Sequence, residues 1–165
     1  YNNNIVKNGF KDYVDGNAGF CGDRRVSSGT GGGTSSTDYQ PYTRISNSSP
    51  NLSCNKNDIY TTDEFEFGNG ALTYPIGLIS ADEAMFAGIP WSGSNQNNYL
   101  YTGEYYWTMS PSDYNSKAIV FIMYFNGTLI NYRVNGTYGV RPVINLKSAI
   151  AITGSGSKTD PFKVG

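Results

Sequence analysis

Two short acidic stretches hold the side chains in this sequence that are best suited to catalysis. "TTDEFEF" contains Asp63, Glu64 and Glu66, and "SADEA" contains Asp82 and Glu83. Glycosidases use two such carboxylates, facing each other across a sugar. Simpler roles fit these residues better, because Glu83 stands where a helix-capping residue is expected and Asp63 and Glu64 fit a solvated turn. We therefore predict that the protein is not an enzyme, with a carbohydrate-active enzyme as the rival reading.

Residues that usually bind metals or cofactors are scarce. The chain has no histidine, which removes the commonest general base and the commonest zinc ligand. It also lacks a phosphate-binding loop, a dinucleotide-binding glycine motif and a Cys-x-x-Cys pair. "NKNDIYTTDE" is a weak calcium candidate, because it has no Asp-x-Asp run. We expect no metal and no cofactor.

The only two cysteines, Cys21 and Cys54, flank a stretch rich in Gly, Ser and Thr. We expect them to form one structural disulfide, which would stabilise the fold by roughly 3–4 kcal/mol in the loop-entropy description. Such a bond would place the protein outside the reducing cytoplasm. Two free buried thiols are the alternative.

The composition limits the kinds of partner that the protein could bind. Twelve basic and 13 acidic residues give a net charge of −1, and only 15% of residues are charged. This balance argues against nucleic acid, which needs a clustered basic surface, and against electrostatic binding to a membrane surface. The 14 tyrosines and 20 glycines, with abundant Asn, Ser and Thr, are typical of binding loops. They are equally typical of turn-rich extracellular β domains.

Length and pattern predict one domain over residues 1–165 with a real core. Residues 5–14 have helix-compatible apolar spacing, although Gly9 weakens that helix by about 1 kcal/mol. Residues 26–58 are low in apolar content and read as a long surface loop, which the cysteine pair would tie down.

The middle of the chain carries the clearest helix signal. Residues 71–79 read as a strand near a sheet edge, because they include a proline. "SADEAMFAG" follows, in which Ser80 and Glu83 form a capping box and Gly88 is a stop signal. The residues expected to face the core are Ala84, Met85 and Phe86. "YLYTGEYYWTMS" then reads as strand or strand and turn with a heavy aromatic load.

The tripeptide Asn-Gly-Thr occurs twice, at 126–128 and 135–137, and Asn-Gly is a strong signal for a two-residue hairpin turn. The two turns predict a three-stranded antiparallel meander, with strands over 117–125, 128–134 and 137–146. With two short helices, this pattern predicts an α+β fold.

Alternation along the meander separates core from surface positions. The expected core residues are Val120, Leu129, Val134, Val140, Val143 and Ile144. A second set is too large to be buried entirely: Ile119, Ile122, Tyr124, Phe125, Ile130, Asn131, Tyr132, Arg133 and Tyr138. An exposed apolar and aromatic patch usually marks an interaction site. The alternative is that the first strand is central and covered on both faces.

Three segments carry a resemblance to a known family: "ALTYPIGLISADEAMFAG", "YLYTGEYYWTMSPS" and "GVRPVINLKSAIAITGSGSKTDPF". They resemble secreted or surface proteins of gut-type bacteria and their phages that end in a C-type-lectin-like domain, related to the formylglycine-generating-enzyme fold. Some relatives are pilin-like, so residues 1–15 would be a remnant of an anchoring helix. Several are variable proteins of diversity-generating retroelements, in which a reverse transcriptase rewrites selected codons. The resemblance covers residues 16–165.

The resemblance implies a variable segment over residues 107–142. The residues that match its opening motif are Trp107, Thr108 and Ser110, and those that match its closing motif are Gly139, Val140, Arg141 and Pro142. The scaffold positions in between are Ala118, Val120, Phe121, Met123, Gly127, Leu129 and Val134. The variable, ligand-binding positions are Ser112, Asp113, Tyr114, Ile119, Ile122, Tyr124, Phe125, Ile130, Asn131, Tyr132, Arg133, Asn135 and Tyr138.

Adenine-directed change of an Asn-type codon yields Asn, Tyr, Ser, Ile, Asp, Phe or Arg, and all the variable positions hold one of these types. Two departures from related folds matter. The tripeptides of calcium-dependent sugar lectins are absent, and both cysteines precede residue 55, so the oxidase chemistry of the formylglycine-generating enzyme is not implied.

The resemblance thus implies a C-type-lectin-like α+β domain, displayed on a cell surface or a virion, that binds a protein or glycan on another cell or phage. The rival reading is a pilin-like subunit that uses its tyrosine-rich surface for assembly. No nucleic-acid partner is expected.

Overall fold

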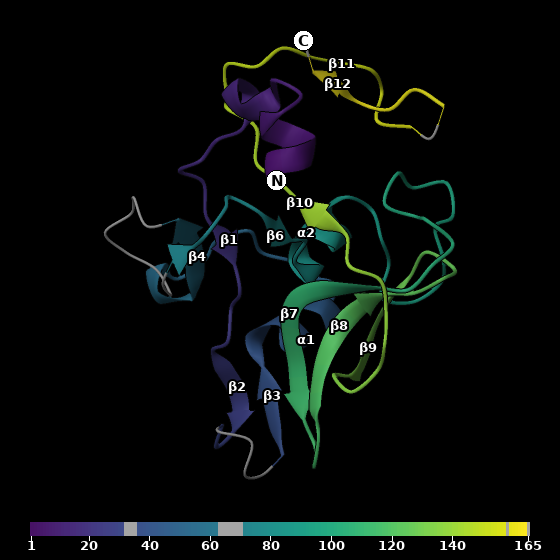
Figure 1. The fold of residues 1–165 in the computed structure, drawn as a ribbon. Helices are drawn as coiled ribbons and strands as arrows, with labels where there is room; N and C mark the ends of the chain where they lie inside the picture. Colours follow the sequence, from purple (N-terminus) through teal and green to yellow (C-terminus); the bar gives the residue numbers. More distant parts are fainter. Residues whose placement is uncertain (32–35, 63–70, 158, 165) are drawn as a thin grey trace.

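The computed structural model describes residues 1–31, 36–62, 71–157 and 159–164. It confirms an α+β architecture with mostly antiparallel sheets (Figure 1). The largest element is a five-stranded antiparallel sheet in the order β2-β3-β7-β8-β9. Its strands are β2 (Val26–Gly29), β3 (Thr37–Tyr39), β7 (Tyr106–Tyr114), β8 (Ala118–Met123) and β9 (Leu129–Arg133).

Three smaller sheets surround this main sheet. The strands β1 (Phe20–Cys21), β4 (Ile59–Thr62) and β5 (Ala71–Leu72) form one, in which β4 and β5 run parallel. The other two are pairs, β6 (Gly77–Leu78) with β10 (Pro142–Val143) and β11 (Ile152–Thr153) with β12 (Lys163–Val164). The predicted strand over residues 71–79 is therefore two short strands, β5 and β6, on either side of a proline.

Two short α-helices, α1 (Gln40–Ser46) and α2 (Ala81–Phe86), cover one face of the main sheet and lie behind it in Figure 1. The predicted capping box of α2 is confirmed: Ser80 Oγ accepts from the Glu83 N–H at 3.2 Å, and Glu83 Oε2 accepts from the Ser80 N–H at 2.7 Å. Gly88 ends the helix with φ of 94°. Phe86 is exposed, contrary to expectation, because three consecutive residues of a helix point in different directions and cannot all face the core.

The predicted helix over residues 5–14 is wrong. A π-helical turn, η1 (Asn2–Val6), and a 3-10 turn, η2 (Phe10–Tyr13), replace it, and neither buries a residue. Gly9 lies between them with φ of 77°, which breaks any continuous helix. Among the described residues, no helix is both long enough and apolar enough to cross a membrane.

The segment 26–58 is not the predicted long loop, because β2, β3, α1 and the 3-10 turn η3 (Lys56–Asp58) all lie within it. The two anchors of α1 in the core are Pro41 and Ile45, and both are buried. Few apolar residues suffice here since the polar side chains of the segment pair with one another and with α2, as shown below.

The predicted meander is confirmed in its first hairpin and wrong in its third strand. β8 and β9 pair across a three-residue loop, in which Gly127 has φ of 80° and the Tyr124 N–H bonds to the Thr128 carbonyl at 2.8 Å. This loop is one residue longer than the predicted turn. After residue 136 the chain leaves the sheet edge, and Gly139 lies beside the start of β7. β10 then pairs with β6, so the meander is β7-β8-β9.

The core lies between the main sheet and the two helices. Its members are Ile45, Ile79, Ala81, Ala84, Ile89, Leu100, Tyr106, Phe121, Met123 and Leu129. Of the predicted core residues, Leu129 is fully buried, Val120, Val143 and Ile144 are half-buried, and Val134 and Val140 are exposed. The last two prove exposed because the third meander strand does not form. Ile122, expected to face outward, is fully buried, so both faces of β8 are covered at this point.

The two ends of the chain meet above the main sheet in Figure 1. The Asp15 N–H bonds to the Asn145 carbonyl at 2.8 Å, and the Lys147 N–H bonds to the Tyr13 carbonyl at 3.0 Å. Contacts of such high sequence separation join the first and last parts of the chain into one unit.

Candidate ligand-binding surface

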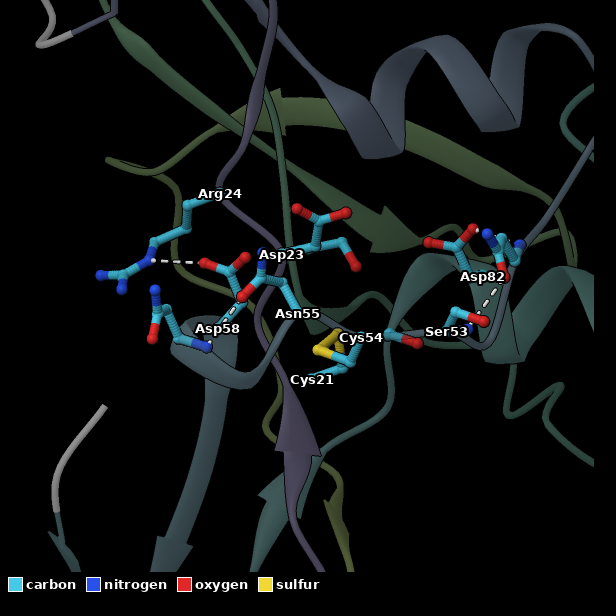
Figure 2. Close-up of a disulfide and its surroundings, with 12 residues drawn as sticks. Cys21, Asp23, Arg24, Ser53, Cys54, Asn55, Asp58 and Asp82 are labelled. Carbon is cyan, nitrogen blue, oxygen red and sulfur yellow. Dashed lines mark hydrogen bonds and ion pairs between the residues drawn. A yellow bond between two sulfur atoms is a disulfide. The ribbon is translucent and has the colours of Figure 1, made fainter. Parts of the chain in front are cut away.

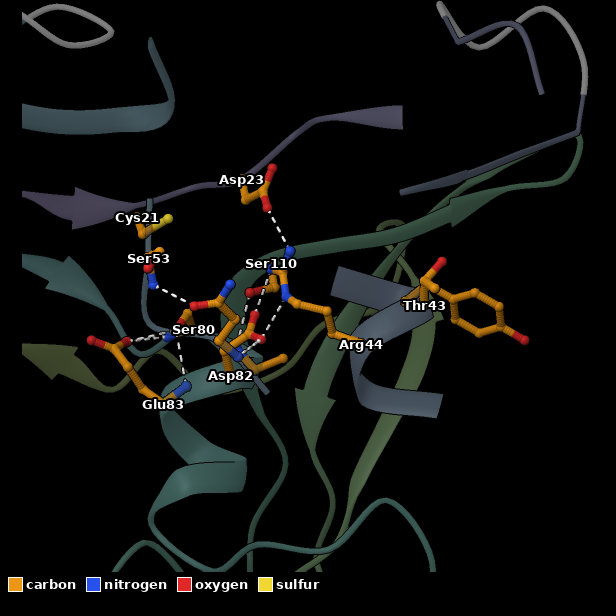
Figure 3. A network of polar contacts seen from close by, with 12 residues as sticks. Cys21, Asp23, Thr43, Arg44, Ser53, Ser80, Asp82, Glu83 and Ser110 are labelled. Atoms are coloured by element: carbon orange, nitrogen blue, oxygen red, sulfur yellow. Dashed lines mark hydrogen bonds and ion pairs between the residues drawn. The ribbon is translucent and has the colours of Figure 1, made fainter. Parts of the chain in front are cut away.

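The charged side chains of α1 and α2 form a buried network and not an open site (Figure 3). Arg44 donates two hydrogen bonds of 2.8 Å to the Asp82 carboxylate and one of 2.8 Å to Asp23. Asp82 also accepts from the Asn51 N–H at 2.9 Å. The Arg44 side chain is only 12% exposed. Every carboxylate oxygen in the network has a donor, so these contacts hold α1, α2 and the chain after β1 together.

The network also fixes the charge of its members. Burial by itself raises the pKa of Asp23, but hydrogen bonds from Arg25 and Arg44 together lower it to about 2. The hydrogen bond to Asp23 raises the pKa of Arg25, and the hydrogen bonds to Asp82 raise that of Arg44. These groups stay ionised across the physiological range, which suits a structural role.

Of the carboxylates that the rival enzyme reading would use, the two that the structure describes are already engaged in other contacts. Glu83 is occupied by the capping box and Asp82 by Arg44. Asp63, Glu64 and Glu66 lie outside the described residues. Within the described part of the chain, no group of three or more His, Cys, Asp or Glu side chains could hold a metal ion.

The predicted disulfide between Cys21 and Cys54 is confirmed, with the two Cα atoms 5.8 Å apart (Figure 2). It joins the end of β1 to the chain before η3, where the Asn55 side chain accepts from the Asn57 N–H at 3.0 Å. The bond fastens the small sheet to the segment that carries the ion network. Disulfides persist in oxidising environments, which indicates a location outside the reducing cytoplasm.

The register of the main sheet divides the proposed variable residues between two faces. Phe121, Met123 and Leu129 belong to the core, so the residues that alternate with them lie on the opposite, outer face. On that face Ile122 is paired with Trp107 on one side and Ile130 on the other. We expected the proposed variable positions to form one outward surface. This is wrong for those on β8 and β9 that share the face of Phe121 and Leu129, which are Ile119, Asn131 and Arg133.

Aromatic side chains gather on the outer face around Ile122. We call this surface the aromatic face, and its six members are Tyr105, Trp107, Tyr124, Phe125, Tyr132 and Tyr138. Tyr105 is stacked on Tyr138 with ring centroids 5.3 Å apart, and Tyr124 meets Tyr105 edge-on at 4.8 Å. Such pairs are each worth about 0.5–1.5 kcal/mol beyond their buried area. The rings thus hold one another in place while they remain accessible.

Exposure differs across the aromatic face. Phe125 is 45% exposed and Tyr132 is 47% exposed, whereas Ile122 beneath them is fully buried. A hydrogen bond with Tyr124, aided by partial desolvation, raises the pKa of Tyr105 to about 12, and partial burial also raises the pKa of Tyr138. The hydroxyls therefore stay protonated, and each can donate or accept a hydrogen bond to a ligand.

Five of the remaining proposed site residues lie away from the aromatic face. At the other end of β8 and β9, the Asn131 amide donates to Ser112 Oγ and Asp113 Oδ2, both at 3.1 Å. Ser112 is fully buried, so it lies behind the surface and not on it. Ile119 pairs with the exposed Arg133 next to this cluster. We call the five residues Ser112, Asp113, Ile119, Asn131 and Arg133 the distal group.

Four proposed positions belong to neither set. Ile122 and Ile130 are register partners on the outer face, whereas Tyr114 and Asn135 lie elsewhere. Tyr114 is half-buried and pairs with Ala118 and Thr37, in the middle of the sheet. Asn135 is exposed in the turn that follows β9. The structure therefore places one polar and one aromatic cluster on different faces, with Tyr114 and Asn135 apart from both.

Sequence reasoning missed Tyr105 and placed Trp107 among the fixed residues. Tyr105 has ring contacts with Tyr124, Phe125 and Tyr138, which makes it the centre of the aromatic face. The heavy aromatic load of "YLYTGEYYWTMS" was the available signal. Alternation places Tyr105 and Trp107 on one face, but the strand that begins at Tyr106 had no predicted start.

Comparison with known proteins found no family model that matches the chain, and neither a curated protein nor a solved structure matched it. The aromatic face is therefore characterised by its own geometry. It combines rigid, mutually packed rings with hydroxyl groups on a sheet framework, which is the makeup of surfaces that bind macromolecules.

Proposed function

We propose that the protein is a ligand-binding domain and that the aromatic face is its binding surface. The observation that carries this proposal is the set of six rings on one side of the main sheet, of which Phe125 and Tyr132 are nearly half exposed. Aromatic residues give large contact areas at small entropic cost, and they dominate binding energy at protein interfaces. Truncation of a central ring would cost about 1–4 kcal/mol of binding free energy.

The domain would be a C-type-lectin-like variable protein of the diversity-generating retroelement type. The two fixed motifs that would bracket its variable segment lie side by side, because the Trp107 N–H donates to the Gly139 carbonyl at 3.0 Å. Their polar side chains bond to the scaffold: Thr108 Oγ1 donates to the Phe121 carbonyl at 2.8 Å, and Arg141 to the Leu100 carbonyl at 2.8 Å. The two ends of the variable segment are thus bonded to each other and to the scaffold. This supports a constant framework that carries exchangeable residues.

Burial at the proposed scaffold positions also supports this division. Phe121, Met123 and Leu129 are buried, and Gly127 adopts a conformation that favours glycine. Ala118 and Val134 are exposed and are the scaffold positions that fit least well. The ligand would be a protein or glycan on another cell or phage, met outside the cell.

Population sequencing of the gene tests this proposal directly. We expect substitutions concentrated at codons 112–138, above all at those of the aromatic face that lie in this range (Tyr124, Phe125, Tyr132 and Tyr138), and confined to adenines of a nearby template copy. Codons for buried residues such as Phe121 would be constant. A uniform gene without a template copy would contradict retroelement diversification. Self-association through the aromatic face, seen by sedimentation at micromolar concentration, would favour the pilin-like subunit instead.

A further inference from the structure

A cleft lies on the outer side of the main sheet, beside the aromatic face. It has a volume of about 580 Å³, within the range of small-molecule sites. One wall comes from the sheet itself, through Met109 and Val120, and the other from the small sheets, through Phe20 and Leu78. Val120 is the register partner of Tyr132, so the cleft adjoins the aromatic face without including its rings.

The small-sheet wall is held in position by glycines. A Cβ on Gly77 would lie 2.3 Å from the Phe20 ring, and a Cβ on Gly22 would lie 2.7 Å from the Tyr60 ring. Both rings therefore pack directly on backbone, which fixes them as lining residues of the cleft. This wall is set by backbone contacts and is formed before any ligand arrives.

Arg24 is the one charged side chain among the described residues that line the cleft. Its side chain is 52% exposed, and its Nε lies 3.9 Å from Asp58 Oδ1, too far for a hydrogen bond (Figure 2). The guanidinium also lies 5.9 Å from the Tyr60 ring centroid. Arg24 is thus in a long ion pair with Asp58 through Nε. Its two Nη atoms have no hydrogen-bond acceptor among the described residues, so a planar anion could bind there by two parallel hydrogen bonds.

We propose that this cleft binds a free amphiphile with a linear apolar body and one carboxylate, that is, a fatty acid. The apolar walls would bury the chain, and Arg24 would bind the carboxylate. A glycan fits poorly, because walls built from side chains such as Phe20, Leu78 and Val120 leave its hydroxyls without partners. This site is independent of the aromatic face and of the function proposed for it.

Titration calorimetry with octanoate, decanoate and dodecanoate, below their micelle concentrations, tests the proposal. We expect one site per chain, with affinity rising about fourfold for each added methylene that enters the cleft. Dodecyltrimethylammonium, which has the same chain and the opposite charge, should bind at least fivefold more weakly than dodecanoate. Equal affinity for both, or no saturable binding of dodecanoate, would overturn the proposal.

Two variants locate the site. Val120→Trp fills the cleft with apolar volume and should abolish dodecanoate binding, while Arg24→Gln should weaken it about two- to fivefold and leave dodecanol unaffected. Lys117→Gln, an exposed cation at the β7–β8 turn, is the matched control and should change nothing. Unchanged melting temperatures show that each variant folds. Undiminished binding to Val120→Trp would place the ligand elsewhere and overturn the proposal.

Two further measurements separate the fatty acid from other occupants. The protein should not sediment with phosphatidylcholine–phosphatidylserine vesicles, and it should remain monomeric whether or not Val120 is replaced. Vesicle binding lost in Val120→Trp would identify a membrane surface as the occupant. A dimer dissociated by Val120→Trp would identify a second copy of the chain. Either result would overturn the proposal, and neither would bear on the aromatic face.

Discussion

The ion network around Arg44 and the aromatic face lie on opposite sides of the same sheet and use their side chains in opposite ways. In the network, Arg44, Asp23 and Asp82 are buried, and each charge is neutralised by a partner. On the aromatic face, Phe125 and Tyr132 remain nearly half exposed, and the described chain does not cover them. The charged residues hold the fold together, whereas the apolar rings meet the solvent.

This difference indicates which side chains remain available to bind a partner. Carboxylates and arginines first suggest chemistry, but the hydrogen-bonding capacity of Arg44 towards Asp23 and Asp82 is used up inside the protein. Rings first suggest a core, but the core is made mostly of aliphatic side chains and Phe121. Of these two regions, the aromatic face is therefore the one with accessible side chains that can bind a partner. The contrast makes four quantitative predictions.

Loss of the Arg44 side chain should have the largest effect. In Arg44→Met, Asp23 and Asp82 stay buried without their shared cation, so the free energy of unfolding should fall by about 3–5 kcal/mol. Urea denaturation followed by circular dichroism measures this. Arg25→Met is the matched control, because Arg25 also bonds to Asp23 but is half exposed, and it should cost under about 1 kcal/mol. Equal losses would show that burial of the network does not matter.

Removal of the disulfide should come next. The double substitution Cys21→Ala with Cys54→Ala frees a loop with a sequence separation of 33 residues. The loop-entropy description gives a loss of about 3–4 kcal/mol in the free energy of unfolding. The aromatic face lies outside this loop, so tyrosine fluorescence of the folded protein should be unchanged. A shift in that fluorescence would show that the disulfide also positions the rings.

Acidification should weaken the network and spare the rings. The pKa of Asp23 falls from an ordinary value of 3.8 to about 2 in the folded protein. Its stabilising contribution, about 2 kcal/mol, is therefore complete above about pH 4 and is lost as the pH falls towards 2. Urea denaturation across this range measures the loss. In Arg44→Met the slope over the same interval should be smaller, and an unchanged slope would assign the effect to other carboxylates.

Local signals in the sequence predicted the parts of the fold that depend on near neighbours. The Ser80–Glu83 capping box, the stop at Gly88, the hairpin at Asn126–Gly127 and the cysteine pairing are all present. Each depends on backbone preferences or on the presence of only two cysteines. The helix predicted over residues 5–14 does not form, because Gly9 adopts a left-handed conformation that the apolar spacing does not reveal.

The parts that failed depend on contacts between distant segments. The helix α1 within the segment 26–58 is held in place because Arg44 pairs with Asp82, a contact that no local pattern reveals. The third meander strand fails because Gly139 returns to Tyr105 and the start of β7 instead of to β9. That return also brings Tyr138 onto Tyr105 and creates the aromatic face. Sequence alone named most of its rings but could not predict that they share one side of the sheet.

Replacement of the most exposed proposed binding residues should have the smallest effect on stability. Tyr132 and Arg133 are both exposed on the edge strand β9, and among the described residues the Arg133 side chain has no hydrogen bond or ion pair. The double substitution Tyr132→Ala with Arg133→Ala should therefore lower the free energy of unfolding by less than about 1 kcal/mol. Ile122→Ala, on the same face as Tyr132 but fully buried, should cost about 2–5 kcal/mol.

The pair of variants separates binding from packing, because Tyr132 and Ile122 share the outer face, and Arg133 extends the test to the neighbouring distal group. If the aromatic face binds a ligand, the double variant should lose retention by cells that retain the unsubstituted domain, while its urea midpoint hardly changes. Ile122→Ala should show the reverse at temperatures where it is still folded, because Ile122 supports the rings from beneath and cannot itself touch a ligand. A double variant as unstable as Ile122→Ala would make Tyr132 and Arg133 part of the packed framework, and the aromatic face would then stabilise the fold as the Arg44 network does.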